Sequence, residues 1–163
     1  MSSALKVVLV TGSRSLTKNP QKEDWAKKLL LEELQDLSPG CIVLQGGAAG
    51  PDTWAGLLVK WATVETHLVD GLVIVRHLNP TGPSQHEFYQ GPPYSSFLAR
   101  DRGLVMRAVA LQKQGFEVST IALEDPESPT GGTRYTLSEA AKARLPWKHA
   151  IYPQPFVSLK EEP

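Results

Sequence analysis

LKVVLV at residues 5–10 runs directly into TGS at residues 11–13. A continuous run of β-branched and aliphatic residues that stops at a glycine turn is typical of a strand buried on both faces in a parallel sheet. A strand of this kind needs helices above and below it. The run therefore predicts an α/β fold.

The rest of the chain alternates helix-like and strand-like segments. Helical spacing of apolar residues, bounded by Pro or Gly, predicts helices at 20–37, 51–62, 97–114 and 135–144. Short apolar runs predict further strands at 41–44, 72–75, 117–123 and 150–152. This order predicts a Rossmann-like, doubly wound parallel sheet with helices on both faces and right-handed crossovers.

The length and the loops suggest how the domain is organised. A chain of 163 residues suits one domain, which we place at residues 1–152. Residues 79–96 are rich in Gly, Pro and Ser and are longer than the usual loops of compact domains. They predict a long loop that is either a lid or a solvated insertion. Residues 153–163 predict a frayed C-terminal tail.

Charge and cysteine content limit the class of partner. Lys plus Arg number 17, as do Asp plus Glu, so no global field attracts polyanions and long nucleic acid is not the expected partner. The single cysteine, Cys41, excludes an internal disulfide and indicates a reducing compartment. No apolar stretch reaches the roughly 18 residues of a membrane span, so we expect a cytoplasmic protein without a membrane partner.

Three tryptophans are candidates for a helix-face contact in a homo-oligomer, if they are exposed. They are Trp25, Trp54 and Trp61.

Two loops that follow predicted strands carry small and polar residues. In the first, Gly12 allows close approach of the backbone, while Ser13 and Arg14 offer a hydroxyl and a guanidinium, although an ordinary polar turn has the same composition. In the second, Gly46 and Gly47 precede a helix start. Asp52 in its first turn either stabilises the helix N-terminus or binds a ribose hydroxyl.

A third loop follows the strand predicted at 117–123. Gly131, Gly132 and Thr133 lie at a predicted helix start, where free N–H groups and a hydroxyl suit a phosphate. Glu124 and Asp125 precede them and would repel that phosphate unless they face a sugar, a metal or solvent. The carboxyl ends of parallel strands meet at one edge of a sheet, so the three loops predict one ligand site.

The predicted third helix contributes a further cation. Arg102 shares an apolar stripe with Leu98, Val105, Met106 and Val109. A guanidinium on such a face needs an anion, a carbonyl or a route to water. A bound phosphate, Asp101 or a carboxylate of the third loop would each serve.

Several well-defined signatures are missing from the chain. It has no GxxxxGK[ST] loop, no GxGxxG fingerprint after the first strand and no GxSxG elbow. The histidines have no metal-ligand spacing with a second His or Cys; they are His67, His77, His86 and His149. The sequence therefore predicts neither a metal site nor a cofactor.

Four motifs in order resemble a known family. GSR at 12–14, GGAAGPD at 46–52, ARDRGLVM at 99–106 and TGGTRYTLSEAAKA at 130–143 are similar to the YspA-like branch of the SLOG superfamily. This Rossmann-like group includes the LOG phosphoribohydrolases and the DNA-processing protein DprA. The resemblance covers roughly residues 6–146, with Gly103 standing where the YspA-like motif has Asn.

The resemblance implies a pocket for a nucleotide or a nucleotide-derived ligand. Its motifs place the contacts at Gly12, Ser13, Arg14, Gly46, Gly47, Asp52, Arg102, Gly132 and Thr133. LOG enzymes have PGGxGTxxE, whose glutamate assists cleavage between base and ribose phosphate. Here Arg134 follows the glycine motif and the nearest glutamate, Glu139, comes nearly a turn late, so the motif does not predict this reaction.

Three functions are therefore in view. The first is a nucleotide-binding sensor, carrier or sequestering module. The second is a nucleoside 5′-monophosphate N-glycosidase, in which Glu124, Asp125 or Glu139 stabilises an oxocarbenium-like centre or activates water. The third is DprA-like binding of single-stranded DNA, which needs a basic groove and stacking aromatic residues.

Overall fold

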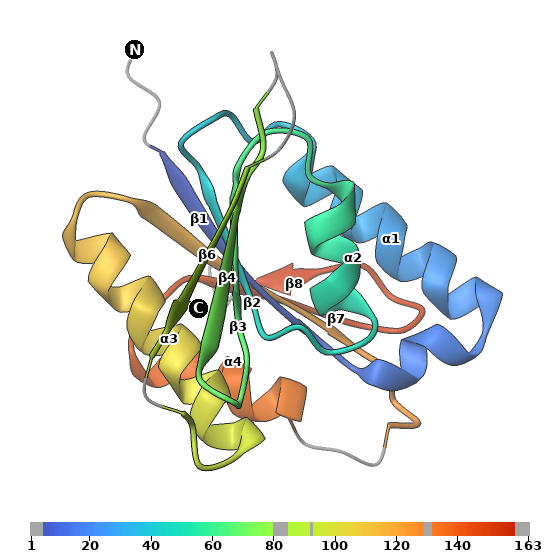
Figure 1. Cartoon of the computed structure of the whole chain (residues 1–163). Coiled ribbons are helices and arrows are strands. Elements are labelled where there is room, and N and C mark those ends of the chain that lie inside the picture. The colour runs from blue at the N-terminus through green and yellow to red at the C-terminus, as the bar shows by residue number, and fades with distance from the viewer. Residues whose placement is uncertain (1–4, 80–84, 92, 129–131, 159–163) are drawn as a thin grey trace.

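A single mixed sheet of eight strands forms the centre of the molecule, in the order β5-β4-β3-β2-β1-β6-β7-β8 (Figure 1). The computed structural model describes residues 5–79, 85–91, 93–128 and 132–158. The strands are β1 Lys6–Gly12, β2 Ile42–Gln45, β3 Thr63–His67, β4 Leu72–His77, β5 Gln85–Gln90, β6 Glu117–Glu124, β7 Trp147–Ile151 and β8 Val157–Ser158. Strands β3, β2, β1, β6 and β7 are parallel, whereas β4, β5 and β8 are added antiparallel.

The chain winds in opposite directions from β1. Strands β2 and β3 add to one side of it and β6 and β7 to the other, so the direction of winding reverses between β1 and β6. A reversal of this kind leaves a crevice at the carboxyl ends of the strands. The predicted Rossmann-like α/β fold is confirmed.

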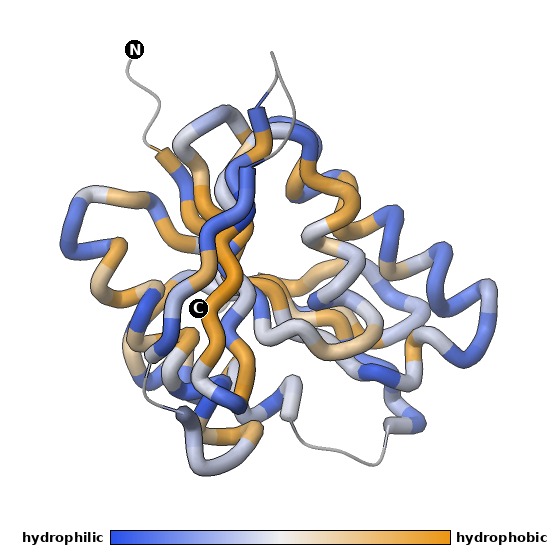
Figure 2. The backbone as a smooth tube through the Cα atoms, viewed as in Figure 1, coloured by the Kyte–Doolittle hydropathy of each residue, from blue (hydrophilic) through white to orange (hydrophobic). Residues whose placement is uncertain are grey.

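Helices cover both faces of the sheet, because the central strands are apolar on both sides. Val8 and Val10 pack in one core with α1 and α2, whereas Val7 and Leu9 pack in a second core with α3 and α4. Apolar residues accordingly follow the central strands, while the outer side of α1 is hydrophilic (Figure 2). The helices are α1 Pro20–Leu34, α2 Pro51–Leu58, α3 Phe97–Lys113 and α4 Gly132–Lys142.

Local signals account for the helix starts. The Asn19 side chain accepts a hydrogen bond from the Lys22 amide at 2.9 Å and Pro20 follows at the first helical position of α1. Ser96 caps α3 in the same way, through the Ala99 amide at 3.0 Å. Gly50 has φ 97° immediately before α2, a backbone conformation that favours glycine.

The region after α2 differs from the prediction. The helix ends at Leu58 instead of Ala62, and residues Thr63–His67 form the unpredicted strand β3. The strand predicted at 72–75 is antiparallel to β3 instead of parallel. The connection is a tight turn, with Gly71 at φ 89° and the Asp70 carboxylate accepting from the Leu72 amide. Such a turn is too short for a parallel crossover.

Two segments predicted to lack regular structure contain strands. In the loop predicted at 79–96, β5 pairs with β4, while residues 80–84 and 92 lie outside the described part of the chain. The prediction of a loop is therefore wrong at 85–90. In the tail predicted at 153–163, β8 pairs with β7, and residues 159–163 are not described.

The tryptophans do not form one free helix face. Trp54 is only 8% exposed, and Trp25 packs edge-on against Tyr152 with ring centroids 5.4 Å apart. Trp61 is exposed but follows the end of α2. Within the described ranges, no helix combines the length and the hydropathy needed to cross a bilayer.

Candidate functional site

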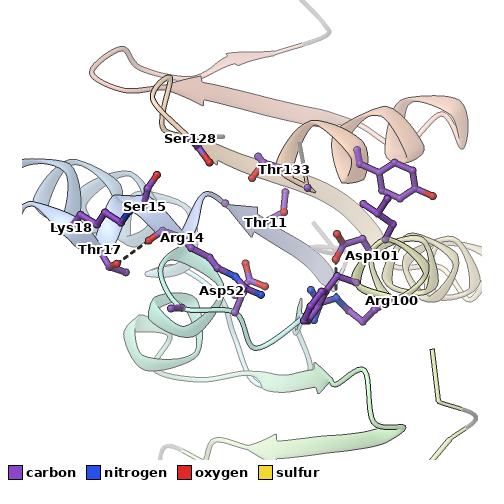
Figure 3. A pocket seen from close by; sticks show the side chains of 17 residues that line it. Thr11, Arg14, Ser15, Thr17, Lys18, Asp52, Arg100, Asp101, Ser128 and Thr133 are labelled. Atoms are coloured by element: carbon purple, nitrogen blue, oxygen red, sulfur yellow. Dashed lines mark hydrogen bonds and ion pairs between the residues drawn. The ribbon is translucent and has the colours of Figure 1, made fainter. Parts of the chain in front are cut away.

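A cleft of about 780 Å³ lies at the carboxyl edge of the sheet, where the winding direction reverses. Residues that follow β1, β2 and β6 line it, together with the first turns of α3 and α4. Arg14, Asp52 and Arg100 reach it from three different segments (Figure 3). The full lining is Thr11, Gly12, Arg14, Ser15, Thr17, Lys18, Ala48, Ala49, Asp52, Phe97, Leu98, Arg100, Asp101, Ser128, Gly132, Thr133 and Tyr135.

The loop after β1 divides its predicted contacts between structure and cleft. A Cβ on Gly12 would lie 2.2 Å from the Pro51 side chain, so this glycine lets α2 start directly against the end of β1. Ser13 is buried, and its Oγ accepts a hydrogen bond from the Asp125 amide at 3.0 Å. Arg14 is exposed and faces the cleft at the start of the short 3₁₀ helix Arg14–Lys18.

The loop after β2 holds the floor of the cleft together. The Gly46 amide donates to Asp52 Oδ2 at 3.0 Å, and the Gly46 carbonyl accepts from the Arg100 guanidinium. A Cβ at Gly46 would lie 2.3 Å from Arg100 Cζ, so only glycine lets the guanidinium lie on this turn. Gly47 turns the chain at φ 75°. The cleft itself is lined by the next residues, Ala48 and Ala49.

Asp52 is a buried carboxyl group facing the ligand space. Asp52 is 5% exposed, and burial raises the pKa of its carboxyl group to about 7, because the charged form loses its hydration. The Gly46 hydrogen bond and the Arg100 charge oppose that shift without cancelling it. The cleft therefore contains a carboxyl group that exchanges its proton close to neutral pH.

The first turn of α3 supplies a cluster that the sequence interpretation missed. Arg100 is 5% exposed, and its Nε donates to Asp101 Oδ1 at 2.8 Å. The guanidinium carbons of Arg14 and Arg100 lie 5.2 Å and 5.7 Å from the centre of the Phe97 ring. Burial raises the pKa of Asp101 despite the Arg100 contact. Two cations from distant parts of the chain thus meet at one aromatic ring.

The predicted apolar stripe through Arg102 is wrong. Arg102 is exposed and lies outside the lining of the cleft, and Leu98 and Met106 are 47% and 57% exposed. The core face of α3 instead comprises Arg100, Asp101, Leu104, Val105, Ala108 and Leu111. The Arg-Asp pair beside Phe97, at a helix start, was the available signal in the sequence.

Gly103 stands where the YspA-like motif has Asn, and its surroundings explain the difference. A Cβ at this position would lie 2.5 Å from Tyr94 Cε1. The Tyr94 ring therefore occupies the space that an Asn side chain would need.

The start of α4 forms another wall of the cleft. Gly132 and Thr133 both line it, whereas Gly131 lies outside the described residues. A Cβ on Gly132 would be in ordinary contact with Asp101 Oδ2, at 3.9 Å. Asp101 thus lies beside the amino end of α4, where a negative charge is stabilised by the helix dipole.

The three carboxylates proposed for catalysis are engaged elsewhere. Glu124 accepts from Arg134 Nε and His149 Nε2, both at 2.9 Å, and Asp125 accepts from Ser15 Oγ at 2.6 Å and from Lys22 Nζ at 3.1 Å. Burial opposes their ionisation, but these donors outweigh it and lower the pKa of both groups. The third, Glu139, accepts from the Tyr135 hydroxyl at 3.1 Å. All three lie outside the residues that line the cleft.

Two further findings bear on the class of protein. In the described part of the chain, no group of three or more His, Cys, Asp or Glu side chains is arranged to hold a metal ion. No protein-family model matches the chain, and no curated protein or solved structure matches it at a significant level. The resemblance to the SLOG superfamily therefore stays a prediction from the four motifs.

Proposed function

We propose that this protein binds a nucleotide or nucleotide-derived small ligand in the cleft and acts as a sensor, carrier or sequestering module. One observation carries the proposal: Arg14 and Arg100 meet around Phe97 at the edge of the sheet where α2 and α4 begin. Guanidinium groups and helix N-termini attract a phosphate.

The balance of charge in the cleft favours an anion. Its basic residues are Arg14, Lys18 and Arg100, against the carboxyl groups of Asp52 and Asp101. Asp101 is already paired with Arg100, and Asp52 with its pKa of about 7 carries only part of a charge at neutral pH. Arg14 and Lys18 make no ion pair with any carboxylate in the described ranges, so both are available to a ligand.

The size of the cleft supports a small ligand. Its volume of about 780 Å³ falls among small-molecule sites, which span roughly 300 to 1,000 Å³. The chain as a whole has no net charge, which does not favour long nucleic acid. A reducing compartment such as the cytoplasm is part of the proposal, since the lone Cys41 is a buried free thiol.

The decisive experiment is a binding titration with paired ligands. Isothermal titration calorimetry with nucleoside mono- and diphosphates, and with the same nucleosides lacking phosphate, should give heat only for the phosphorylated members. Lys60→Ala is the matched control for Arg14→Ala, because it removes one exposed positive charge outside the cleft. Binding of none of the nucleotides, or equal binding of nucleoside and nucleotide, contradicts the proposal.

The hydrolase alternative has one specific observation in its favour. Among the carboxyl groups lining the cleft, Asp52 has a pKa of about 7, which suits proton transfer at neutral pH. Incubation of the protein with nucleoside monophosphates, followed by chromatography for free base, tests it. Release of base that disappears in Asp52→Asn supports hydrolysis, and measurable binding without release excludes it.

A further inference from the structure

Phe97 is an exposed aromatic residue at the point where the two arginines of the cleft meet. It is the first residue of α3 and lines the cleft. The Ser96 side chain accepts a hydrogen bond from the Ala99 amide, and the Ser96 carbonyl accepts one from the Arg100 amide, both at 3.0 Å. The Phe97 ring therefore projects from a well-anchored turn of the cleft wall.

Arg100 is held in place by the protein itself. Its residue is 5% exposed, its Nε donates to Asp101 Oδ1 at 2.8 Å, and its Nη1 donates to the Gly46 carbonyl. The Asp101 carboxylate balances the positive charge of this guanidinium. Arg100 thus keeps its position without a ligand, and its repulsion of a second cation at the Phe97 ring is weakened.

Arg14 is held in a different way. It is exposed, and its guanidinium carbon lies 5.2 Å from the centre of the Phe97 ring. Its guanidinium makes no ion pair or hydrogen bond with the residues that the structure describes. Its charge also reaches Asp101, where it opposes the rise in pKa that burial causes.

The ring offsets a cost that an exposed arginine meets on binding. A long, flexible side chain loses conformational freedom when it is fixed against an anion. A cation over an aromatic face is attracted by the ring quadrupole, so part of that freedom is lost before the ligand arrives. Such preorganisation raises affinity without adding a contact to the ligand.

We propose that Phe97 is a positioning residue, whose ring holds the Arg14 guanidinium at the cleft where it binds the phosphate of the ligand. This inference rests on the proposed function. It gives the two arginines separate roles, both visible at the cleft in Figure 3. Arg14 contacts the phosphate, whereas Arg100 is fixed on the turn after β2. Phe97 acts through Arg14.

The rival role for Phe97 is direct stacking on the base of a nucleotide. Stacking predicts that loss of the ring weakens the nucleoside and the nucleotide alike, with or without Arg14. Positioning predicts that loss of the ring weakens only the phosphorylated ligand, and only while Arg14 is present. The two roles therefore separate in binding measurements.

The first test is isothermal titration calorimetry of the full chain with AMP, GMP, CMP and UMP, and with the four nucleosides. Phe97→Leu should weaken the nucleotides about two- to five-fold, the size of an exposed cation–π contact, and leave the nucleosides unchanged. Phe97→Tyr keeps the ring and should bind like the wild type. Phe88→Leu is the matched control, because it makes the same substitution at an exposed phenylalanine outside the cleft. The urea midpoint of Phe97→Leu should stay in place.

A double-mutant cycle tests whether Phe97 acts through Arg14. In an Arg14→Ala background, Phe97→Leu should produce no further loss of nucleotide affinity, because the guanidinium that the ring holds is gone. The same fold-loss in both backgrounds would show that the ring contacts the ligand itself, and this overturns the positioning role.

NMR of the ligand-free protein tests the contact without any nucleotide. Side-chain protons of Arg14 over the ring should be shifted upfield by its ring current, and this shift should vanish in Phe97→Leu and persist in Phe97→Tyr. Absence of the shift in the wild type overturns the inference. Nucleotide binding that is equally tight in the wild type and Phe97→Leu overturns it as well, and leaves the proposed function in place. Binding of none of the nucleotides by the wild type contradicts the proposed function, and the positioning role falls with it.

Discussion

The Gly46 amide donates a hydrogen bond to Asp52 Oδ2 at 3.0 Å, which joins the end of β2 to the start of α2. One hydrogen bond is not enough to keep this carboxylate charged, because Asp52 is buried and its pKa rises to about 7. Asp52 therefore stabilises the folded chain more in its protonated form than in its charged form.

We expect the contribution of Asp52 to the free energy of unfolding to fall as pH rises from about 4 to above 7. The Asp52 pKa is higher in the folded chain than in the unfolded one, so the folded state binds more protons in this window. The stability that Asp52 contributes is complete below the pKa of this group in the unfolded chain. It is lost as pH rises through the pKa in the folded chain. Between pH 5 and pH 8 the loss is on the order of 2 kcal/mol.

Urea unfolding at these two pH values measures the loss. In Asp52→Asn the side chain does not titrate, so the difference between the two pH values should shrink by about that amount. An unchanged pH dependence in the variant would show that Asp52 is ionised in the folded protein.

Two glycines of the cleft should respond differently to a methyl group. In Gly12→Ala the new Cβ meets the Pro51 ring at 2.2 Å and the Leu123 carbonyl at 3.0 Å, neither of which can rotate away. We expect a loss of about 1 to 3 kcal/mol in the free energy of unfolding, as for other overpacked sites. In Gly132→Ala the nearest described atom is Asp101 Oδ2 at 3.9 Å, so stability should be nearly unchanged.

Ligand binding completes this comparison. Gly132 lines the cleft, so Gly132→Ala should weaken a phosphorylated ligand while leaving the urea midpoint in place. If Gly132→Ala unfolds the protein as readily as Gly12→Ala, the α4 start is needed for the fold instead of for the ligand.

The parallel part of the fold could be predicted because each of its elements carries a local signal. The apolar run 5–10 marks β1, and Asn19 with Pro20 marks the start of α1. Strand β5 carries no such signal, since QHEFYQ has no alternation of polar and apolar residues and pairs only because β4 lies beside it. Long-range pairing of this kind is not encoded in the local pattern.

The phase of α3 shows why the site was only partly predictable. Its inward face includes the charged pair Arg100 and Asp101, so spacing of apolar residues selects the wrong face. Leu98 and Met106 shifted the predicted stripe toward Arg102, yet Leu98 lines the cleft and Met106 is exposed. Apolar spacing does not distinguish a side chain facing the core from one facing a ligand.

Arg14 and Arg102, the two arginines that the sequence motifs place at the phosphate, now separate in a test. Arg14→Ala should weaken a nucleotide by about 1.5 to 3 kcal/mol, the value of a hydrogen bond to a charged group, with little effect on the matching nucleoside. Arg102→Ala should change neither, because Arg102 is exposed and outside the cleft lining. Calorimetric titration of both variants with the nucleotide and the nucleoside measures these affinities. A larger loss for Arg102→Ala than for Arg14→Ala would favour the contacts implied by the YspA-like motifs over the contacts in the cleft.

A second buried carboxylate should make the protein sensitive to acid. Glu65 is 4% exposed, and it accepts from Arg107 Nη2 at 2.8 Å, while His67 Nε2 lies 3.0 Å from its Oε1. Burial alone would raise its pKa, but His67 and Arg107 outweigh burial and lower the pKa to about 2. The stability from Glu65 is therefore present above the pKa of the unfolded chain and is lost as pH falls toward 2.

Removing the arginine should expose this dependence. Arg107→Ala leaves the Glu65 carboxylate buried with a weaker partner, and we expect it to cost about 1 to 3 kcal/mol at pH 7 in urea unfolding. The cost should shrink as the pH is lowered, because a protonated Glu65 no longer needs the cation. Lys113→Ala removes a charge at the exposed end of the same helix and should leave stability within about 0.5 kcal/mol at both pH values. A cost for Arg107→Ala that is equal at acid and neutral pH would mean that the arginine acts through packing of its side chain, and that its charge contributes nothing to holding Glu65 ionised.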